Sequence, residues 1–240
     1  MESASYGDAF VDVYDDWYPL NPAAEVAAIR GAVPAGGRVL ELGAGTGRLA
    51  VALADAGFDV VALDGSLAML AVLAAKDPAG RVTRVAGDLV DIPPGPFDAV
   101  VLTRNTLFNV TRPAQDRLLG RVAPALRSGG SIWIEADEID PSAPPTGCVP
   151  RPRTGDELVM TSWDHDAETS TVRGRFVTVE GRGHAVETRT WTVYYRSPSD
   201  LDRAAEAAGL ALVGRHADWA GQAWPGEGRH VSRYVHRPIR

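Results

Sequence analysis

Apolar runs alternate with longer amphipathic stretches over the first 136 residues of the chain. The apolar runs have the length of buried strands, and the stretches between them repeat apolar residues with helical spacing. The expected strands cover residues 38–42, 58–63, 81–86, 97–102 and 131–136. The expected helices cover residues 22–30, 47–57, 66–73 and 115–126. Strands that alternate with helices in this way predict an α/β fold with a doubly wound, mostly parallel sheet.

The pattern changes after Ala136. Residues 137–155 are rich in proline and acids and are expected to form a loop, with the acidic run 135–140 solvated. From Glu157 to about Tyr195, polar residues alternate with β-branched and aromatic residues. This alternation predicts about three antiparallel strands, inserted after the fifth strand of the α/β frame.

The α/β pattern resumes toward the C-terminus. A helix is expected over residues 199–209, and strands are expected over 210–217 and 230–236. The inserted strands therefore interrupt one fold that begins and ends in the same α/β frame.

Composition narrows the possible functions. The formal net charge of −7 does not suit a general nucleic-acid binder, which needs a basic surface. Cys148 is the one cysteine, so the chain has no internal disulfide and no cysteine-based zinc site. The N-terminal segment lacks the basic and apolar regions of a signal peptide, and no apolar run is long enough for a membrane span. We expect a cytoplasmic protein that binds neither nucleic acid nor membrane.

The strongest motif lies between the first predicted strand and the helix that follows it. Gly43, Gly45 and Gly47 occupy the sharp turn of Glu-Leu-Gly-Ala-Gly-Thr-Gly. Glycine tolerates positive φ and lets a ligand approach the backbone closely. Asp64 ends the second strand, 21 residues after Gly43, which is near the spacing expected for an acid that binds a ribose.

Two more strand ends carry polar residues. Asp88 and Leu89 follow the third strand, and Thr103, Arg104 and Asn105 follow the fourth. The carboxyl ends of parallel strands meet at one edge of the sheet, so these residues are expected to face the same crevice as the glycine turn.

The motif that begins at Glu41, with the acids after strands two and three, resembles class I S-adenosylmethionine (SAM)-dependent methyltransferases over residues 38–136. The resemblance implies a Rossmann-like fold and SAM as cofactor. It implies that the glycines line the cofactor, that Asp64 binds the ribose and Asp88 the adenine, and that Leu89 offers a backbone amide. The implied cofactor-binding set is Glu41, Gly43, Ala44, Gly45, Gly47, Asp64, Gly65, Asp88, Leu89 and Thr103, with Thr103 near the methionine end.

Two alternatives stay open at this point. One is a SAM-binding protein of the same fold that transfers no methyl group, and the other is a nicotinamide-dependent oxidoreductase. With the resemblance, the expected organisation is a cap helix and SAM-binding core over 1–136, an inserted antiparallel β lid on the substrate side over 137–196, and the C-terminal part of the core over 197–240.

The N-terminal run from Tyr14 to Tyr18, with the inserted strands, is similar to small-molecule methyltransferases of secondary metabolism. Among these it resembles N-methyltransferases of nucleotide-linked amino-deoxysugars. This likeness implies that Tyr14 and Tyr18 cover the cofactor. It also implies methyl transfer to nitrogen or oxygen of a small metabolite in natural-product biosynthesis.

Candidate acceptor-side residues come from the N-terminal run, the fourth strand end and the insertion. Histidine has an unperturbed pKa near neutrality and is the natural base for O-methylation, whereas an amine needs no obligatory base. The catalytic candidates are His165, Tyr14 and Asn105. The substrate-binding candidates are Trp17, Tyr18, Arg104, Arg175, Tyr195 and His230, and Trp191 is expected in the roof of the pocket.

No pair of histidines has metal-ligand spacing, so no metal is expected. The expected partner is a small-molecule methyl acceptor, and the inserted strands are a candidate homodimer contact.

Overall fold

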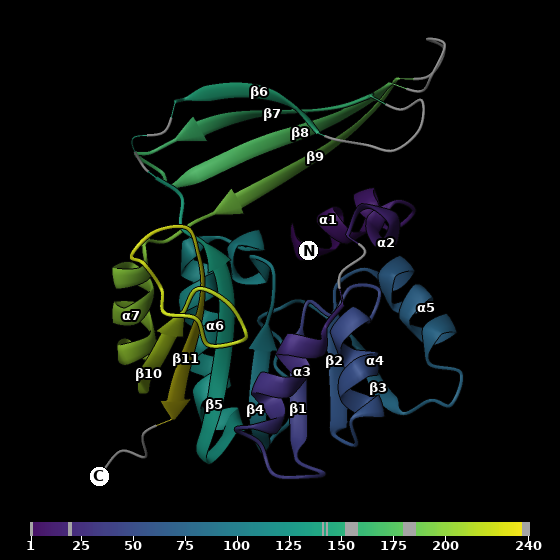
Figure 1. The fold of residues 1–240 in the computed structure, drawn as a ribbon, viewed down its shortest axis with the longest axis vertical. Helices are drawn as coiled ribbons and strands as arrows, with labels where there is room; N and C mark the ends of the chain where they lie inside the picture. Colours follow the sequence, from purple (N-terminus) through teal and green to yellow (C-terminus); the bar gives the residue numbers. More distant parts are fainter. Residues whose placement is uncertain are drawn as a thin grey trace.

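A seven-stranded sheet forms the core of the molecule, and a four-stranded sheet lies beyond the carboxyl ends of its central strands (Figure 1). The computed structural model describes residues 2–18, 21–140, 142, 144–151, 158–179 and 186–236. The large sheet has the order β10-β11-β5-β4-β1-β2-β3. Its strands are β1 (Arg38–Leu42), β2 (Asp59–Asp64), β3 (Val82–Ala86), β4 (Phe97–Leu102), β5 (Leu126–Asp137), β10 (Leu210–His216) and β11 (Arg229–His236).

Strands β1 to β5 run parallel to one another. The last strand, β11, is antiparallel to both β5 and β10, between which it lies. This arrangement confirms the Rossmann-like, mostly parallel α/β fold. Strand β5 is longer than the expected 131–136: it begins at Leu126, which pairs with Phe97 of β4, and ends at Asp137, which pairs with Arg229 of β11.

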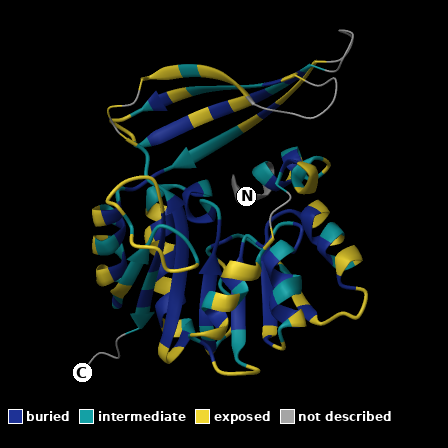
Figure 2. Cartoon of the chain, viewed as in Figure 1, coloured by how far each residue is buried: buried dark blue, intermediate teal, exposed yellow. Residues whose placement is uncertain are grey.

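Helices cover both faces of the large sheet, and the strands are buried between them (Figure 2). They are α3 (Ala23–Arg30), α4 (Arg48–Asp55), α5 (Leu67–Lys76), α6 (Arg112–Ala125) and α7 (Pro198–Ala207), with the 3-10 helix η1 (Thr106–Asn109) after β4. Alternate residues of each strand enter two cores: Leu40 packs with α6 and α7, whereas Val39 packs with α3 and α4. Because both faces are covered, the central strands have continuous apolar runs.

The small sheet consists of β6 (Thr146–Arg151), β7 (Leu158–Asp166), β8 (Thr171–Val179) and β9 (Val186–Tyr194), all antiparallel. The antiparallel insertion is confirmed, but the prediction of a loop throughout 137–155 was wrong, and the sheet has four strands where about three were expected. The error has a physical cause: β6 is an edge strand, where Pro150 is tolerated, so its proline content hides a segment that pairs with β7.

The N-terminal helices α1 (Glu2–Phe10) and α2 (Tyr14–Trp17) lie between the two sheets (Figure 1). Phe10 and Trp17 pack edge-on against Phe176 of β8, with ring centroids 5.7 and 5.2 Å apart. Arg189 of β9, 5% exposed, donates to the Ala9 carbonyl at 2.9 Å and to the Asp12 carboxylate at 2.6 Å. Apolar contact and a buried guanidinium thus join the N-terminus to the small sheet.

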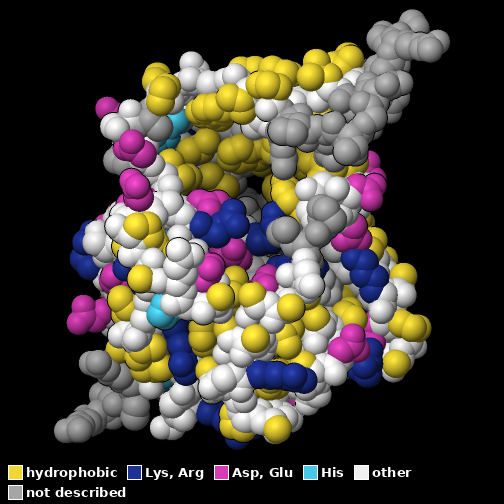
Figure 3. Space-filling view, viewed as in Figure 1, with side chains coloured by type: hydrophobic (Ala, Val, Ile, Leu, Met, Phe, Trp, Pro, Cys, Tyr) yellow, Lys and Arg dark blue, Asp and Glu magenta, His cyan; other side chains and the backbone are white. Residues whose placement is uncertain are grey.

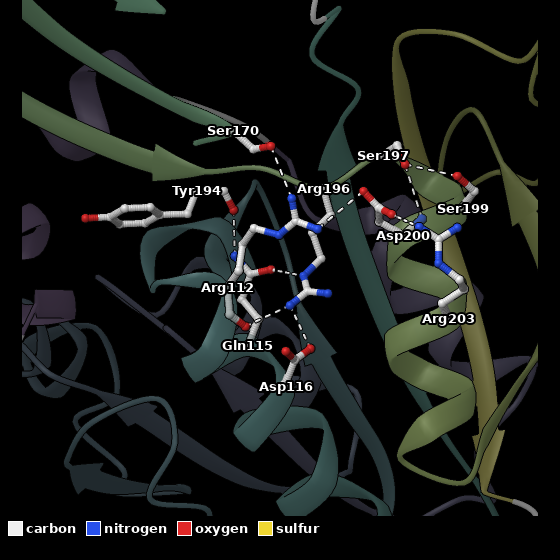
Figure 4. A network of polar contacts seen from close by, with 10 residues as sticks. All are labelled: Arg112, Gln115, Asp116, Ser170, Tyr194, Arg196, Ser197, Ser199, Asp200 and Arg203. Carbon is white, nitrogen blue, oxygen red and sulfur yellow. Dashed lines mark hydrogen bonds and ion pairs between the residues drawn. The ribbon is translucent and has the colours of Figure 1, made fainter. Parts of the chain in front are cut away.

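A polar network fastens the base of the small sheet to the core (Figure 4). Arg196, which follows β9, donates to Gln115 and Asp116 of α6 at 2.8 and 2.6 Å. Gln115 in turn donates to the Tyr194 carbonyl at 2.6 Å. Arg112 bridges Ser170 and Asp200 in the same network. Since Arg196 is only 7% exposed, losing one of its partners would leave a buried charge poorly compensated.

Helices in the described part of the chain are all too short or too polar to cross a membrane.

His230 is enclosed on β11, with 1% of its surface exposed. Its Nδ1 forms a hydrogen bond with the Ser232 hydroxyl at 3.0 Å, and the Trp224 ring lies edge-on to it. Burial, helped by the positive charge of Arg215, lowers the His230 pKa to about 4. The folded protein therefore favours neutral His230, because a charged imidazole would lose its hydration there.

We predict that acid weakens the fold through His230. Its pKa is about 4 in the folded state and near 6.5 when unfolded, so stability is full above pH 6.5 and is lost as the pH falls toward 4. The loss should be on the order of 3 kcal/mol. Urea unfolding at pH 7 and pH 5 measures about 2 kcal/mol of this loss, and the remainder appears below pH 5. His230→Asn should reduce the pH dependence of the unfolding free energy, whereas His216→Asn, a partly exposed residue of β10, should not. The same pH dependence in the wild type and both variants would contradict the prediction.

Candidate active site

A cavity of about 310 Å³ lies at the carboxyl ends of β1, β2 and β4, beneath the small sheet. Figure 3 shows the hollow between the two sheets, with apolar side chains above it and charged side chains at its rim. The glycine loop, the residues after β2 and β4, the N-terminal helices and strands β8 and β9 all contribute to its wall. Segments far apart in the sequence therefore build one site.

The glycine loop forms the floor of the cavity. Gly43, Gly45 and Gly47 all have positive φ, at 69°, 55° and 83°. A Cβ on Gly43 would lie 2.5 Å from Thr106 Cγ2, and one on Gly47 would lie 2.4 Å from Leu73 Cγ, so both glycines are required for packing. Gly45 has open space, with the Tyr14 ring 4.0 Å from the position of a Cβ. Gly43 and Gly45 line the cavity, so a ligand can approach their backbone.

Asp64 connects the glycine loop with the loop after β2. One carboxylate oxygen accepts from the Gly45 amide at 2.7 Å, and the other accepts from the Ser66 amide at 2.8 Å. Burial raises the Asp64 pKa, while these backbone amides oppose the rise. Each oxygen keeps a second lone pair, and Asp64 lines the cavity, so it can accept from the hydroxyls of a ligand.

Glu41 lies beneath the loop, 3% exposed, and its Oε2 has no hydrogen-bond partner among the residues that the structure describes. Burial raises its pKa to about 8, against the charge of nearby Arg48. A cationic group above the loop would stabilise the charged carboxylate. Glycines open to a ligand and the acceptor oxygens of Asp64 together fit the ribose hydroxyls of SAM.

The other implied cofactor residues divide into two groups. Gly65 and Leu89 line the cavity, and so does Met69, which the sequence analysis missed. The residues that do not line it are Glu41, Ala44, Gly47, Asp88 and Thr103. Asp88 accepts from the Val90 amide at 3.3 Å instead. For these five, a role in cofactor binding stays a prediction.

Three tyrosines close the cavity from the N-terminal side: Tyr6, Tyr14 and Tyr18. Burial raises the pKa of Tyr6 and of Tyr14, so both phenols keep their protons at neutral pH. They can donate hydrogen bonds but are poor bases.

Polar contacts fix the N-terminal helices over the cofactor loops. The Thr46 hydroxyl donates to Asp15 at 2.7 Å, and the Ser66 hydroxyl donates to Asp8 at 2.5 Å. Trp17 does not line the cavity, because its ring packs on Phe176 in the layer behind.

The loop after β4 forms the opposite wall. Arg104 and Asn105 have φ values of 55° and 63°, a conformation that costs non-glycine residues energy and persists where neighbours enforce it. Glu135 accepts from the Arg104 amide at 3.0 Å. The Asn105 side chain donates to Asp137 at 2.8 Å and accepts from the Asp137 amide at 2.7 Å. Arg229 donates to the same carboxylate at 2.9 Å.

The acidic run predicted to be solvated is therefore partly buried. Glu135, at 6% exposure, is part of β5 and holds the tip of the β4 loop, since pairing with β11 extends β5 into the run. The position of Asp137 directly after a buried strand was the signal that could have revealed it as a site residue. No comparable signal marked its partner Arg229.

The structure does not bring His165, Tyr195, His230 or Arg175 to the cavity. His165 forms a buried hydrogen bond with the Tyr195 hydroxyl at 2.8 Å, near the end of β7. Arg175 is exposed on the outer side of β8. Among the described residues no histidine lines the cavity, and His184 lies outside them. The predicted roles of these four residues have no support from their positions.

The small sheet supplies the roof. Phe176, Trp191 and Val193 line the cavity, as expected for Trp191, whereas Phe176 and Val193 were missed. A Cβ on Gly174 would lie 2.1 Å from the Trp191 ring, so this glycine provides the space in which the indole lies.

Comparison with known proteins identifies the family. A family model described as a methyltransferase domain matches residues 39–130. An uncharacterized methyltransferase of Mycobacterium tuberculosis is 34% identical over 206 residues, covering 83% of this chain and 75% of the relative. The cypemycin N-terminal methyltransferase of a Streptomyces species is 29% identical over 94% of this chain and 95% of its own. The solved structure of the CcbJ methyltransferase from Streptomyces caelestis is 28% identical and covers 98% of this chain and 99% of that one, with a TM-score of 0.91.

These matches include the glycine loop and the strand ends that build the cavity, and the fold agrees over nearly the whole chain. The chain belongs to the SAM-dependent methyltransferase family, and SAM is its cofactor.

Proposed function

We propose that this enzyme methylates an amino nitrogen of a small-molecule natural product. The observation that carries the proposal is that no histidine among the described residues lines the cavity, and that burial keeps the phenols of Tyr6 and Tyr14 protonated. The Asp137 carboxylate in the wall is paired with Arg229, which makes it a weak base. A neutral amine needs no obligatory base, whereas a phenol or alcohol benefits from one. The likeness to a cypemycin N-terminal methyltransferase supports the same chemistry.

When bound, SAM supplies a methyl group on a positively charged sulfur that is already a good leaving group. The protein therefore has to align the acceptor nitrogen with the methyl carbon and the sulfur, and to exclude water. Phe176 and Trp191 form an apolar roof, and the tyrosines of the N-terminal helices close one side. Asp137 presents a carboxylate that can accept a hydrogen bond from an amine N–H and so orient the nitrogen lone pair.

We also propose a task for each segment of the chain. Residues 1–136 form the cap helix and the SAM-binding core, residues 197–240 complete that core, and residues 137–196 form a lid over the acceptor. The contacts of Phe176, Trp191 and Val193 with the cavity support the second assignment.

We predict that Asp64→Ala weakens binding of S-adenosylhomocysteine (SAH) by about tenfold to a hundredfold, because hydrogen bonds to a carboxylate contribute about 1.5–3 kcal/mol. Isothermal titration calorimetry measures the affinity, and thermal unfolding checks that the variant is folded. Asp59→Ala, on an exposed residue at the start of the same strand, is the matched control. An SAH affinity equal to that of the wild type would remove Asp64 from the cofactor site.

We further predict that isotope-labelled SAM transfers its methyl group to amines and not to phenols. The acceptor panel holds amino sugars, amino acids, peptides with a free N-terminus and phenols, and mass spectrometry locates the label. His165→Gln should keep most of the turnover, because His165 contacts Tyr195 and not the cavity. Label on phenols alone, lost in His165→Gln, would show O-methylation with His165 as the base and contradict the proposal.

A further inference from the structure

The Arg104 side chain differs from the other charged groups of the cavity wall. It is half-buried, and its guanidinium carbon lies 4.4 Å from the centre of the Tyr18 ring. Among the described residues, no carboxylate lies within ion-pair distance of this guanidinium. Arg229, the second arginine of the wall, is paired with Asp137 at 2.9 Å. A half-buried guanidinium that has no carboxylate partner and lines a cavity can pair with an anionic group of a ligand.

The surrounding structure holds Arg104 in an unfavourable backbone conformation. Its φ of 55° is followed by 63° at Asn105, and such values cost about 1–3 kcal/mol each. Glu135 accepts from the backbone amide of Arg104 and not from its guanidinium. Glu135 therefore fixes the loop through the backbone, and the Arg104 guanidinium is not paired with it.

A series of ring contacts connects Arg104 with the N-terminal side of the cavity. Tyr14 lies against Gly45, Tyr18 lies 5.1 Å from Tyr14 between ring centroids, and the Arg104 guanidinium lies over Tyr18. The same cavity is lined by Asn109 and Asp137 and by the roof of the small sheet. The guanidinium is therefore part of the wall that an acceptor bound in this cavity would contact.

The contact with Tyr18 uses the ring face and not a hydrogen-bond acceptor. The guanidinium lies over the Tyr18 ring, so its N–H groups are available as donors. That fork matches the paired oxygens of a carboxylate or phosphate. The charge acts within the buried site, since Arg104 is the strongest influence that opposes the rise in the Tyr14 pKa caused by burial.

We propose that Arg104 binds an oxyanion, a carboxylate or a phosphate, carried by the methyl acceptor. The inference rests on the proposed function and narrows it: the substrate is an amine that also has an acidic group. An arginine at this place also disfavours a protonated amine nearby, which keeps the nucleophile in the neutral form that can attack.

The test measures oxyanion binding to the SAH-saturated protein, without methyl transfer. The probes are inorganic phosphate and acetate, and intrinsic tryptophan fluorescence reports binding because Trp191 lines the cavity. Arg104→Gln should weaken binding of the better probe by at least about tenfold, the loss expected for a charge-assisted pair. Arg104→Lys should fall between the two, because it keeps the charge but not the fork. Arg117→Gln, on an exposed residue of α6, should leave binding unchanged.

Several outcomes would overturn the inference. One is that the wild type binds neither phosphate nor acetate up to roughly 50 mM. Another is that Arg104→Gln binds the better probe as tightly as the wild type does. A third is that Arg104→Gln loses SAH affinity by about tenfold, which would assign Arg104 to the carboxylate of the cofactor. Preference for phosphate over acetate, or the reverse, identifies the acidic group. Failure of the proposed function stays distinguishable, because it is measured by methyl transfer to amines, and oxyanion binding is measured without turnover.

Discussion

The hydrogen bonds of the Asp64 carboxylate are the interaction on which the site depends. One oxygen holds the Gly45 amide and the other the Ser66 amide, so one buried side chain joins the loops that follow β1 and β2. An unpaired carboxylate at this depth would be costly, and the two amides offset that cost. The same arrangement leaves Gly45 open toward the cavity, where a cofactor can approach it.

Closure of the cavity builds on these loops. Ser66 and Thr46, which lie next to them, bind Asp8 and Asp15 of the N-terminal helices. The opposite side of those helices packs on the small sheet, where Arg189 donates to the Ala9 carbonyl. The N-terminal segment therefore contacts both the cofactor loops and the small sheet, and its tyrosines line the cavity between them.

Charged side chains organise the cavity wall that the loop after β4 forms. Glu135 and Asp137 end β5 and hold the loop after β4 in a conformation that it would not adopt alone. Asp137 also forms an ion pair with Arg229, whereas Arg104 lines the cavity without a carboxylate partner among the described residues. With protonated tyrosines and an apolar roof, this wall is suited to holding and aligning an acceptor more than to removing a proton from it.

Local pattern in the sequence determined the α/β order, the glycine turn and the position of Asp64, because strand periodicity and the need for positive φ act over a few residues. Only the tertiary structure decided which distant side chains meet. Strand β6 was not predicted, because an edge strand tolerates proline. The ion pair of Asp137 with Arg229 depends on the pairing of β11 with β5. His165 has the chemistry of a base, but its place along β7 puts it against Tyr195. Strand pairing decides where along a sheet each side chain lies, and that pairing joins residues too far apart in sequence for a local pattern to reveal.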